Sequence, residues 1–171
     1  MVALLYFSPT MGDFNELEKW YEREDPWGYS LHPDDRVRKE KILSLLTLYG
    51  ITPEKTLDVG CGEGWLTKDL PGKLTGWDAS VNAMMRFPEN VGPWDGTGKF
   101  DLVVTTGTLY NQYDWRGIID SVKRAASRWV LVAGVPGWIR PERAEFGKLI
   151  HSEEIAYRDL GNIIELYQTN L

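Results

Sequence analysis

Apolar residues recur at helical spacing over the first third of the chain. They form two sets, separated by a proline- and glycine-containing stretch at residues 25–29. The first set predicts a short helix capped by Asp13, and the second predicts a helix from Pro33 to Tyr49 that Gly50 ends. The residues expected along one side of these helices are Phe14, Leu17, Trp20 and Tyr21 in the first, and Val37, Lys41, Ile42, Leu45, Leu46 and Tyr49 in the second.

The pattern changes at Thr56, where short apolar runs begin to alternate with helical stretches. Such alternation is typical of βαβ units around a buried parallel sheet, so the fold class is α/β. Strands are expected near 56–60, 74–78, 100–105 and 129–134, and helices near 63–70, 79–87, 114–127 and 141–150. The runs 155–158 and 163–167 flank Gly161-Asn162 and predict a C-terminal antiparallel hairpin.

Length, charge and cysteine content narrow the function classes. With 171 residues and no repeat or linker, we expect a single domain over 1–171, a helical lid at 1–50 on a core at 55–171. The net charge of −6 disfavours a nucleic-acid partner. A lone cysteine and two histidines allow no internal disulfide and no recognisable metal cluster.

The sequence also supports expectations about cellular location and assembly. Residues 1–7 are apolar but too few to span a bilayer, and predict a short strand, a packed arm or a disordered tail. We expect a cytoplasmic protein without a membrane partner. The pattern leaves its oligomeric state open between monomer and homodimer.

The strongest chemical signal is a glycine-rich turn between the first expected strand and helix. Gly60, Gly62 and Gly64 stand at alternate positions there, where a ligand can approach the backbone closely. The G-x-G-x-G spacing differs from the G-x-G-x-x-G of dinucleotide-binding proteins. Asp58, two residues before Gly60, would repel a pyrophosphate but attract an ammonium group. A nicotinamide-dependent oxidoreductase is therefore disfavoured.

Two further loops are expected at the same edge of the sheet. Asp78 ends the second strand, eighteen residues after Gly60, and its carboxylate can accept both hydroxyls of a ribose. Capping of the helix at 79–87 is the alternative role for Asp78. The strand expected at 100–105 leads into the polar stretch Thr105-Thr106-Gly107-Thr108-Leu109-Tyr110, so three loops converge on one crevice.

As a set, the segment from Leu57 to Gly64, Asp78, and Phe100-Asp101-Leu102-Val103 with Leu109-Tyr110 resembles motifs I, II and IV of the class I S-adenosylmethionine-dependent methyltransferases. The resemblance covers roughly residues 55–135 and implies a Rossmann-like fold with S-adenosyl-L-methionine as cofactor. It implies that Asp58 orders the cofactor's amino group and that Thr106 closes over its sulfonium side. The turn Gly60, Cys61 and Gly62 would line the methionine part, and Asp78 with Ala79 would hold the ribose.

A second resemblance lies in the N-terminal part. Asp25-Pro26-Trp27-Gly28-Tyr29, followed by a basic helix, is similar to the entry segment of nodulation-type N-methyltransferases. This implies that Trp27 and Tyr29 form an aromatic lid and that a cation meets the cofactor's carboxylate. Arg38 and Lys41 are both candidates for that cation.

The chain departs from the family pattern between Asp78 and Asp101. Only 22 residues intervene, and no clear apolar strand is visible among them. We expect a missing or stub third strand, with Asp95 as the stand-in for the acid that receives the adenine amino group. Trp94 or Met84 would pack against the adenine ring.

The acceptor-facing residues are the least specific part of the pattern. No Asn/Asp-Pro-Pro-aromatic motif of DNA amino-methylases follows residue 105, so a small-molecule acceptor, methylated at nitrogen or oxygen, is the leading hypothesis. Tyr110 and Asp114 are the catalytic candidates, with His32 as either a general base or a capping residue. A non-catalytic cofactor-binding subunit, or methylation of RNA or protein, are the alternatives. Other residues expected to face the acceptor are Trp27, Tyr29, Asn111, Tyr113, Trp138 and Arg140.

Overall fold

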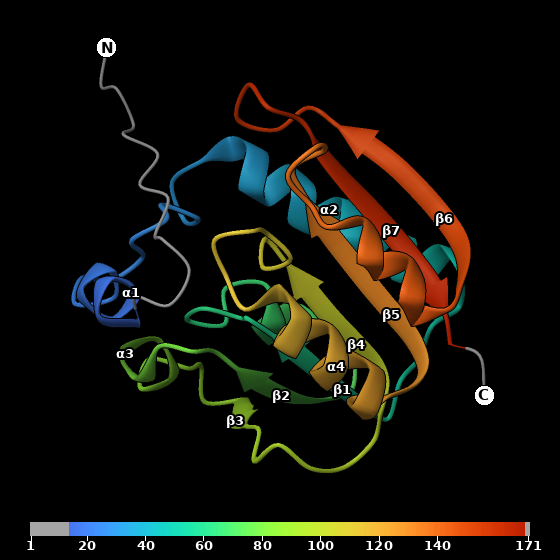
Figure 1. Ribbon diagram of the computed structural model, residues 1–171, viewed down its shortest axis with the longest axis horizontal. Coiled ribbons are helices and arrows are strands. Elements are labelled where there is room, and N and C mark those ends of the chain that lie inside the picture. Colours follow the sequence, from blue (N-terminus) through green and yellow to red (C-terminus); the bar gives the residue numbers. More distant parts are fainter. Residues whose placement is uncertain (1–13, 170–171) are drawn as a thin grey trace.

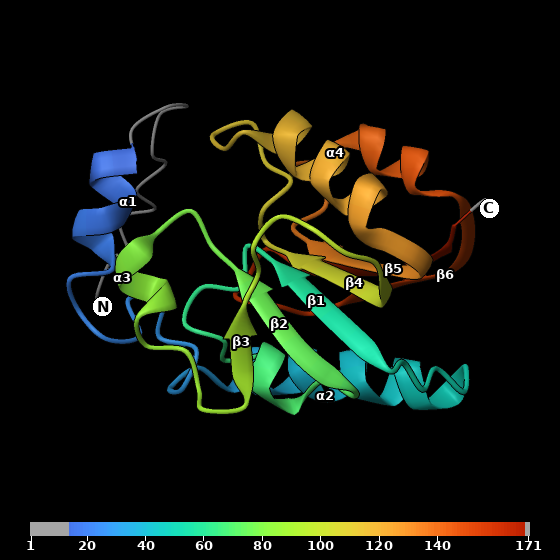
Figure 2. The ribbon, with the colours of Figure 1, turned by 90° about the horizontal axis from the view of Figure 1, so that it is seen from below.

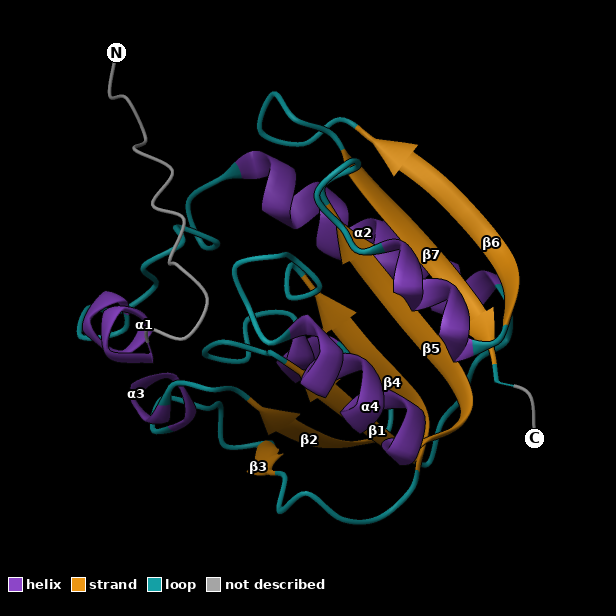
Figure 3. Ribbon diagram, viewed as in Figure 1, coloured by secondary structure: helices purple, strands orange, loops and turns teal. Residues whose placement is uncertain are grey.

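A computed structural model describes residues 14–169 of the chain, which form a seven-stranded sheet with helices on both faces (Figures 1 and 3). The predicted cap Asp13 and the apolar run 1–7 lie outside the described residues. The helices are α1 (Phe14–Trp20), α2 (Pro33–Leu48), α3 (Val81–Met84) and α4 (Trp115–Ala125), with 3-10 turns η1 (Thr67–Asp69) and η2 (Pro141–Phe146). The strands are β1 (Lys55–Val59), β2 (Lys73–Trp77), β3 (Val91–Pro93), β4 (Phe100–Thr106), β5 (Ala126–Gly134), β6 (Lys148–Ile155) and β7 (Asn162–Gln168).

The strand order is β3-β2-β1-β4-β5-β7-β6. The first five strands are parallel, and β7 runs antiparallel between β5 and β6. The predicted mostly parallel sheet with a C-terminal antiparallel hairpin is therefore confirmed. Because β1, β2 and β4 are parallel neighbours, their carboxyl ends meet at one edge, where the glycine turn, Asp78 and the loop after Thr106 begin.

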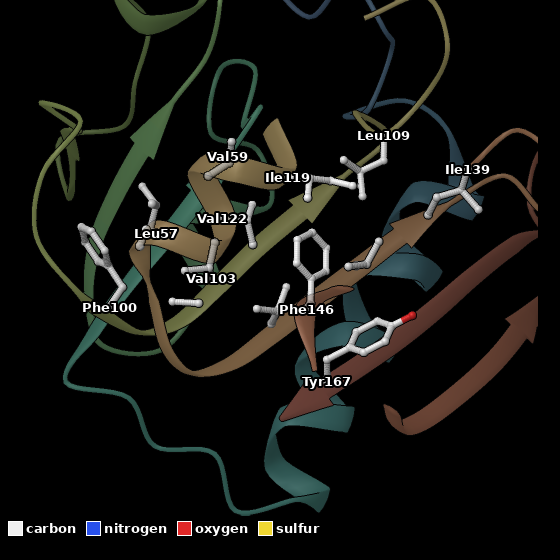
Figure 4. Close-up of a cluster of buried hydrophobic side chains, with 14 of the residues drawn as sticks. Leu57, Val59, Phe100, Val103, Leu109, Ile119, Val122, Ile139, Phe146 and Tyr167 are labelled. Carbon is white, nitrogen blue, oxygen red and sulfur yellow. The ribbon is translucent and has the colours of Figure 1, made fainter. Parts of the chain in front are cut away.

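The helices divide the core into two layers. Figure 2 shows α4 on one face of the sheet and α2 on the other. On the α4 face, Leu57 and Val103 pack with Ile119, as Figure 4 shows. On the α2 face, Ile42 packs with Leu102. Side chains alternate along a strand, so Asp58, between Leu57 and Val59, is directed to the α2 face.

The second predicted helix is confirmed and begins at Pro33 as expected, but it ends at Leu48, one residue before the predicted Tyr49, and its buried side differs from the prediction. Ile42, Leu45 and Leu46 are buried as expected, whereas Val37 and Tyr49 are 42% and 37% exposed. Asp35 and Arg38 are buried instead, because they bind each other and the β6–β7 turn. No helix among residues 14–169 is long and apolar enough to cross a bilayer.

The bounds of several helices and strands differ from those predicted from the sequence. The helix expected at 63–70 is only the turn η1, because the glycines hold left-handed φ angles as far as Gly64, at +79°. The helix expected at 141–150 is the 3-10 turn η2, which ends at Phe146 because β6 begins at Lys148. The strand run expected at 155–158 was wrong beyond Ile155, since residues 156–161 form the turn of the hairpin. The helix expected at 79–87 is reduced to the four residues of α3. Between Asp78 and Asp101, where we expected a missing or stub strand, the chain forms the three-residue stub β3.

Candidate functional site

The glycine turn is tied to the end of β2 and pressed against the loop after β4. The backbone N–H groups of Gly60 and Cys61 both donate to the carbonyl of Trp77, at 2.7 and 3.1 Å. Gly60 has φ of +77°, and a Cβ there would lie 2.1 Å from Cγ2 of Thr108. Glycine is thus required for both the backbone conformation and the close approach of the β4 loop. The sequence pattern did not single out Thr108, because this contact joins segments far apart in the chain.

Asp58 is a buried carboxylate with one oxygen left free. Its side chain is 1% exposed, and Oδ2 accepts a hydrogen bond from Oγ1 of Thr67 at 2.8 Å. Oδ1 is inaccessible to solvent and has no hydrogen-bond partner among residues 14–169. Burial raises the pKa of Asp58 to about 7, opposed by the Thr67 hydrogen bond and by the charge of Arg38. A buried carboxylate oxygen without a donor indicates a place for a cationic or hydrogen-bonding ligand group.

Asp78 joins the glycine turn to the segment that follows β2. Its Oδ2 accepts from the N–H of Gly62 at 2.7 Å, and its Oδ1 accepts from the N–H of Ser80 at 2.9 Å. Ser80 is the N-cap of α3, so the alternative capping role belongs to Ser80 rather than Asp78. Asp78 and Ala79 are both half-buried, and burial raises the pKa of Asp78. Each carboxylate oxygen has a second lone pair with which to accept a ligand hydroxyl.

Cys61 is packed within the turn. Its Sγ would lie 2.8 Å from a Cβ at Gly76, and burial raises the pKa of the thiol well above its ordinary value. A protonated, enclosed thiol is a poor nucleophile. Cys61 therefore contributes to the turn through packing and its backbone N–H.

Residues 14–32, which we call the cap segment, cover the turn with aromatic side chains. The Tyr21 hydroxyl lies 2.8 Å from the position of a Cβ at Gly62 and accepts a hydrogen bond from Nε1 of Trp27 at 2.8 Å. Tyr29 packs against Trp65, with ring centroids 5.7 Å apart. The cap segment thus brings Trp27 to the Tyr21 hydroxyl beside the turn, and Tyr29 to Trp65, the residue that follows the turn. The structure adds Tyr21, which the helical spacing had assigned only to packing.

Arg38 lies in a buried charged cluster at the amino end of α2. It donates to Oδ1 of Asp35 at 3.2 Å and stacks its guanidinium 4.9 Å from the Tyr157 ring. Asp35 is fully buried and also accepts from the Tyr157 hydroxyl at 2.7 Å and from Nε of Arg158 at 3.0 Å. Two cations thus share one carboxylate, which leaves the cluster with spare positive charge. The rival cation Lys41 instead pairs with Glu153 at 2.9 Å.

A second group of aromatic side chains lies in the segments that follow β4 and β5. Tyr110 stacks on Tyr113 with centroids 6.4 Å apart, and Trp138 meets Tyr110 edge-on at 6.1 Å. The Tyr110 hydroxyl accepts from the N–H of Val135 at 2.9 Å. Burial raises the pKa of Tyr110 and of Tyr113, and the charge of Asp78 raises that of Tyr113 further. Tyr110 and Tyr113 are therefore neutral donors, and Thr106 is half-buried at the end of β4 beside them.

Other candidates have structural partners. Nδ1 of His32, the N-cap of α2, accepts from Asp34 N–H at 3.4 Å, and the Asp114 carboxylate caps α4 through the N–H of Gly117. Asp95 is exposed after β3, and hydrogen bonds from the Thr97 side chain and backbone lower its pKa. Trp94 is buried, with Nε1 donating to the Thr97 carbonyl at 2.6 Å, so its ring belongs to the core. Over residues 14–169, no group of His, Cys, Asp and Glu has the arrangement of a metal site.

Comparisons with known proteins identify the fold. No protein-family model matches the chain, and no curated protein matches its sequence. Among solved structures it is similar to the N-methyltransferase NodS from Bradyrhizobium japonicum with S-adenosyl-L-homocysteine, at 21% identity and TM-score 0.75 over 92% of this chain and 98% of that one. The magnesium protoporphyrin IX methyltransferase ChlM from Synechocystis with bound S-adenosylmethionine matches at 15% identity, TM-score 0.69, over 92% and 97%.

A third similar structure is the 1,6-didemethyltoxoflavin-N1-methyltransferase from Burkholderia thailandensis, bound to 1,6-didemethyltoxoflavin and S-adenosylhomocysteine. It matches at 15% identity with a TM-score of 0.67, over 92% of this chain and 87% of that one. At these identities the likeness establishes the fold: the chain has the Rossmann-like fold of S-adenosylmethionine-dependent methyltransferases, as the sequence resemblance implied. The chemistry has to be argued from the site itself.

Proposed function

We propose that this protein is an S-adenosylmethionine-dependent methyltransferase that methylates a nitrogen or oxygen atom of a small molecule. The observation that carries the proposal is the free, buried Oδ1 of Asp58 beside the glycine turn, within electrostatic reach of Arg38. A buried carboxylate with an unused oxygen and a nearby buried cation together suit the ammonium and carboxylate of an amino-acid group.

The remaining parts of the site suit the rest of that cofactor. Asp78 has lone pairs for the ribose hydroxyls. Gly60 and Gly62 allow Thr108 and the Tyr21 hydroxyl to lie against the turn, so these two side chains would border the bound molecule. Asp95 lies two residues after β3, and its Oδ2 has no hydrogen-bond partner among the described residues, so it stays our candidate for the adenine amino group. Trp27 and Tyr29 would cover the bound molecule.

The mechanism assigns positioning to the protein's own side chains. S-adenosylmethionine supplies an electrophilic methyl group on a sulfonium centre. The aromatic wall of Tyr29, Tyr110, Tyr113 and Trp138 would orient the acceptor and exclude water, and Tyr110 would donate a hydrogen bond from its neutral hydroxyl. Asp114 is engaged in helix capping, which favours an acceptor that is nucleophilic without a strong base, such as a neutral amine.

The alternatives have less support. Methylation of RNA or protein would need the basic patch at Arg140, Arg143 and Lys148, but Arg140 pairs with Glu142 and Arg143 pairs with Glu165. NAD binding is disfavoured by the buried Asp58 at the glycine turn. We propose further that residues 1–171 act as one domain with a small-molecule partner. A monomer and a homodimer are both compatible with the proposal.

The proposal predicts that Asp78→Ala weakens cofactor binding by about 1–3 kcal/mol, because two charge-assisted hydrogen bonds to the ribose are lost. Calorimetric titration of each protein with S-adenosylhomocysteine measures this. Asp120→Ala, an exposed carboxylate on α4, is the matched control and should bind as the parent does. Equal affinities of the Asp78 variant and the parent would refute the ribose role.

Catalysis is separated from mere binding by a transfer assay. The protein is incubated with methyl-labelled cofactor and a small-molecule metabolite extract, and we expect label in a low-molecular-mass product. Tight cofactor binding with no labelled product across extracts would favour the non-catalytic subunit instead.

A further inference from the structure

The three residues that follow α1 are held by one arginine from another part of the chain. Nη1 of Arg86, two residues after α3, donates to the carbonyls of Tyr21 at 2.7 Å and Arg23 at 3.2 Å. Nη2 donates to the carbonyl of Glu22 at 3.1 Å. Backbone carbonyls outside helices and strands need donors from elsewhere, and one guanidinium can supply several of them. Because α1 has only seven residues, it depends on such contacts from outside itself.

The same guanidinium reaches the glycine turn through Glu63. Nη1 of Arg86 donates to Oε1 of Glu63 at 2.9 Å, and Oε2 of Glu63 accepts from the N–H of Asp25 at 2.8 Å. The Glu63 side chain is only 16% exposed, so the pair is partly shielded from water. Arg86 and Glu63 therefore connect α3, the turn and the cap segment in one hydrogen-bonded unit.

A second set of contacts fixes the other end of the same surface. The Glu18 carboxylate accepts from the N–H groups of Val81 and Asn82, and Nδ2 of Asn82 donates to the Glu18 carbonyl at 3.3 Å. Figures 1 and 2 both show α1 and α3 side by side at the end of the molecule where β2 ends. The cap segment is thus attached to the segment that begins at Asp78.

We infer that Arg86 and Glu63 are positioning residues that hold the cap segment over the cofactor site. We call their hydrogen-bonded pair the latch. They act through Tyr21, whose hydroxyl lies against Gly62 and whose pKa is raised by burial and by the charge of Asp78. With the latch closed, Tyr21 and Trp27 cover the turn, and release of a bound molecule requires the latch to open. The cofactor part of this inference rests on the proposed function, whereas the attachment of the cap segment does not.

Limited proteolysis of the ligand-free protein tests the attachment. Trypsin cleavage after Lys19 and Arg23, followed by mass spectrometry, should be about tenfold faster in Arg86→Ala than in the parent, because the open segment is more populated. Cleavage after Lys123 in α4 should be unchanged, since a globally unstable variant would be cut faster at every site. Arg124→Ala is the matched control, because Arg124 is an exposed α4 arginine whose side chain bonds Ser121 alone among the described residues.

Two variants separate the latch from simple loss of structure. Glu63→Gln keeps an acceptor for the Asp25 N–H but loses the ion pair, and Arg86→Lys keeps the charge without the planar fork. Trypsin should cleave both variants after Lys19 and Arg23 at rates between those of the parent and of Arg86→Ala.

Cofactor release tests the consequence. S-adenosylhomocysteine should dissociate about tenfold faster from Arg86→Ala, with KM for S-adenosylmethionine raised and kcat unchanged at saturation. Cleavage and dissociation rates equal to those of the parent would overturn the inference. If the parent binds neither molecule, the proposed function fails, while the cleavage rates still decide whether the latch exists.

Discussion

Asp58→Asn is expected to weaken binding of S-adenosylmethionine while stabilising the ligand-free protein. An amide at position 58 can still accept from an ammonium but carries no negative charge, and loss of one charge-assisted hydrogen bond costs about 1.5–3 kcal/mol, or roughly a tenfold to hundredfold loss of affinity. The side chain is buried and its Oδ1 has no partner among residues 14–169, so the ionised form is costly without a ligand. Titration calorimetry and thermal unfolding measure the two effects.

The pH dependence follows from the direction of the shift. Because the folded pKa of Asp58 is raised to about 7, its stability contribution is complete at low pH and is lost as pH rises through that value. The free energy of unfolding of Asp58→Asn should therefore exceed that of the parent by about 1–3 kcal/mol near pH 8, and the difference should shrink toward pH 5. Affinity of the parent should rise up to neutral pH and fall above about pH 8, where an α-amino group loses its proton.

The matched control for Asp58 lies at the opposite end of the sheet. Oδ2 of Asp101 accepts from the N–H groups of Glu54 and Lys55 at 2.8 and 3.2 Å. Asp101→Asn should lower stability without changing cofactor affinity. An Asp58 variant that binds as tightly as the parent would contradict the amino-group role.

Asp35→Asn should destabilise the protein by about 3–5 kcal/mol, because removing one partner leaves buried charge uncompensated. Asp35 is the shared counter-ion of Arg38 and Arg158, and it also accepts from Tyr157. Arg158 in turn donates to the carbonyl of Trp27 at 2.9 Å, so the loss would reach the cap segment. Urea unfolding measures the free energy of unfolding.

Exposed carboxylates provide the comparison for Asp35. Asp120→Asn on the surface of α4 should change the free energy of unfolding by less than about 0.5 kcal/mol. An equally small effect at Asp35 would show that Arg38 and Arg158 find other partners or water. Their role as a source of spare positive charge would then be lost.

The sheet and the positions of the glycine turn, Asp58 and Asp78 at its edge could be predicted because their signals are local. The strand from Thr56 to Val59, the glycines after it and Asp78 at the end of β2 are continuous patterns of a few residues. The helix predicted at 63–70 was wrong. Its apolar spacing is that of a helix, but Gly62 and Gly64 hold left-handed φ angles. Likewise Lys148–Ile155 was taken partly as helix because its strand character depends on pairing with β7.

The contacts that sequence patterns missed join distant segments. Asp35 meets Arg158 across more than a hundred residues, and Arg86 meets the end of α1. A charged residue on a helix is most simply assigned to solvent, so burial of Asp35 and Arg38 has no local signal. Tyr21 appeared as one more apolar position of α1, although its hydroxyl lies against Gly62.

A calorimetric titration of the ligand-free protein tests the central claim most directly, that the turn at Gly60–Gly64 with Asp58 and Asp78 binds an amino-acid nucleoside. The titration uses S-adenosylmethionine, S-adenosylhomocysteine and NAD in parallel. We expect saturable binding of the first two at one site per chain and no heat from NAD. Binding of NAD with no binding of the other two would contradict the account.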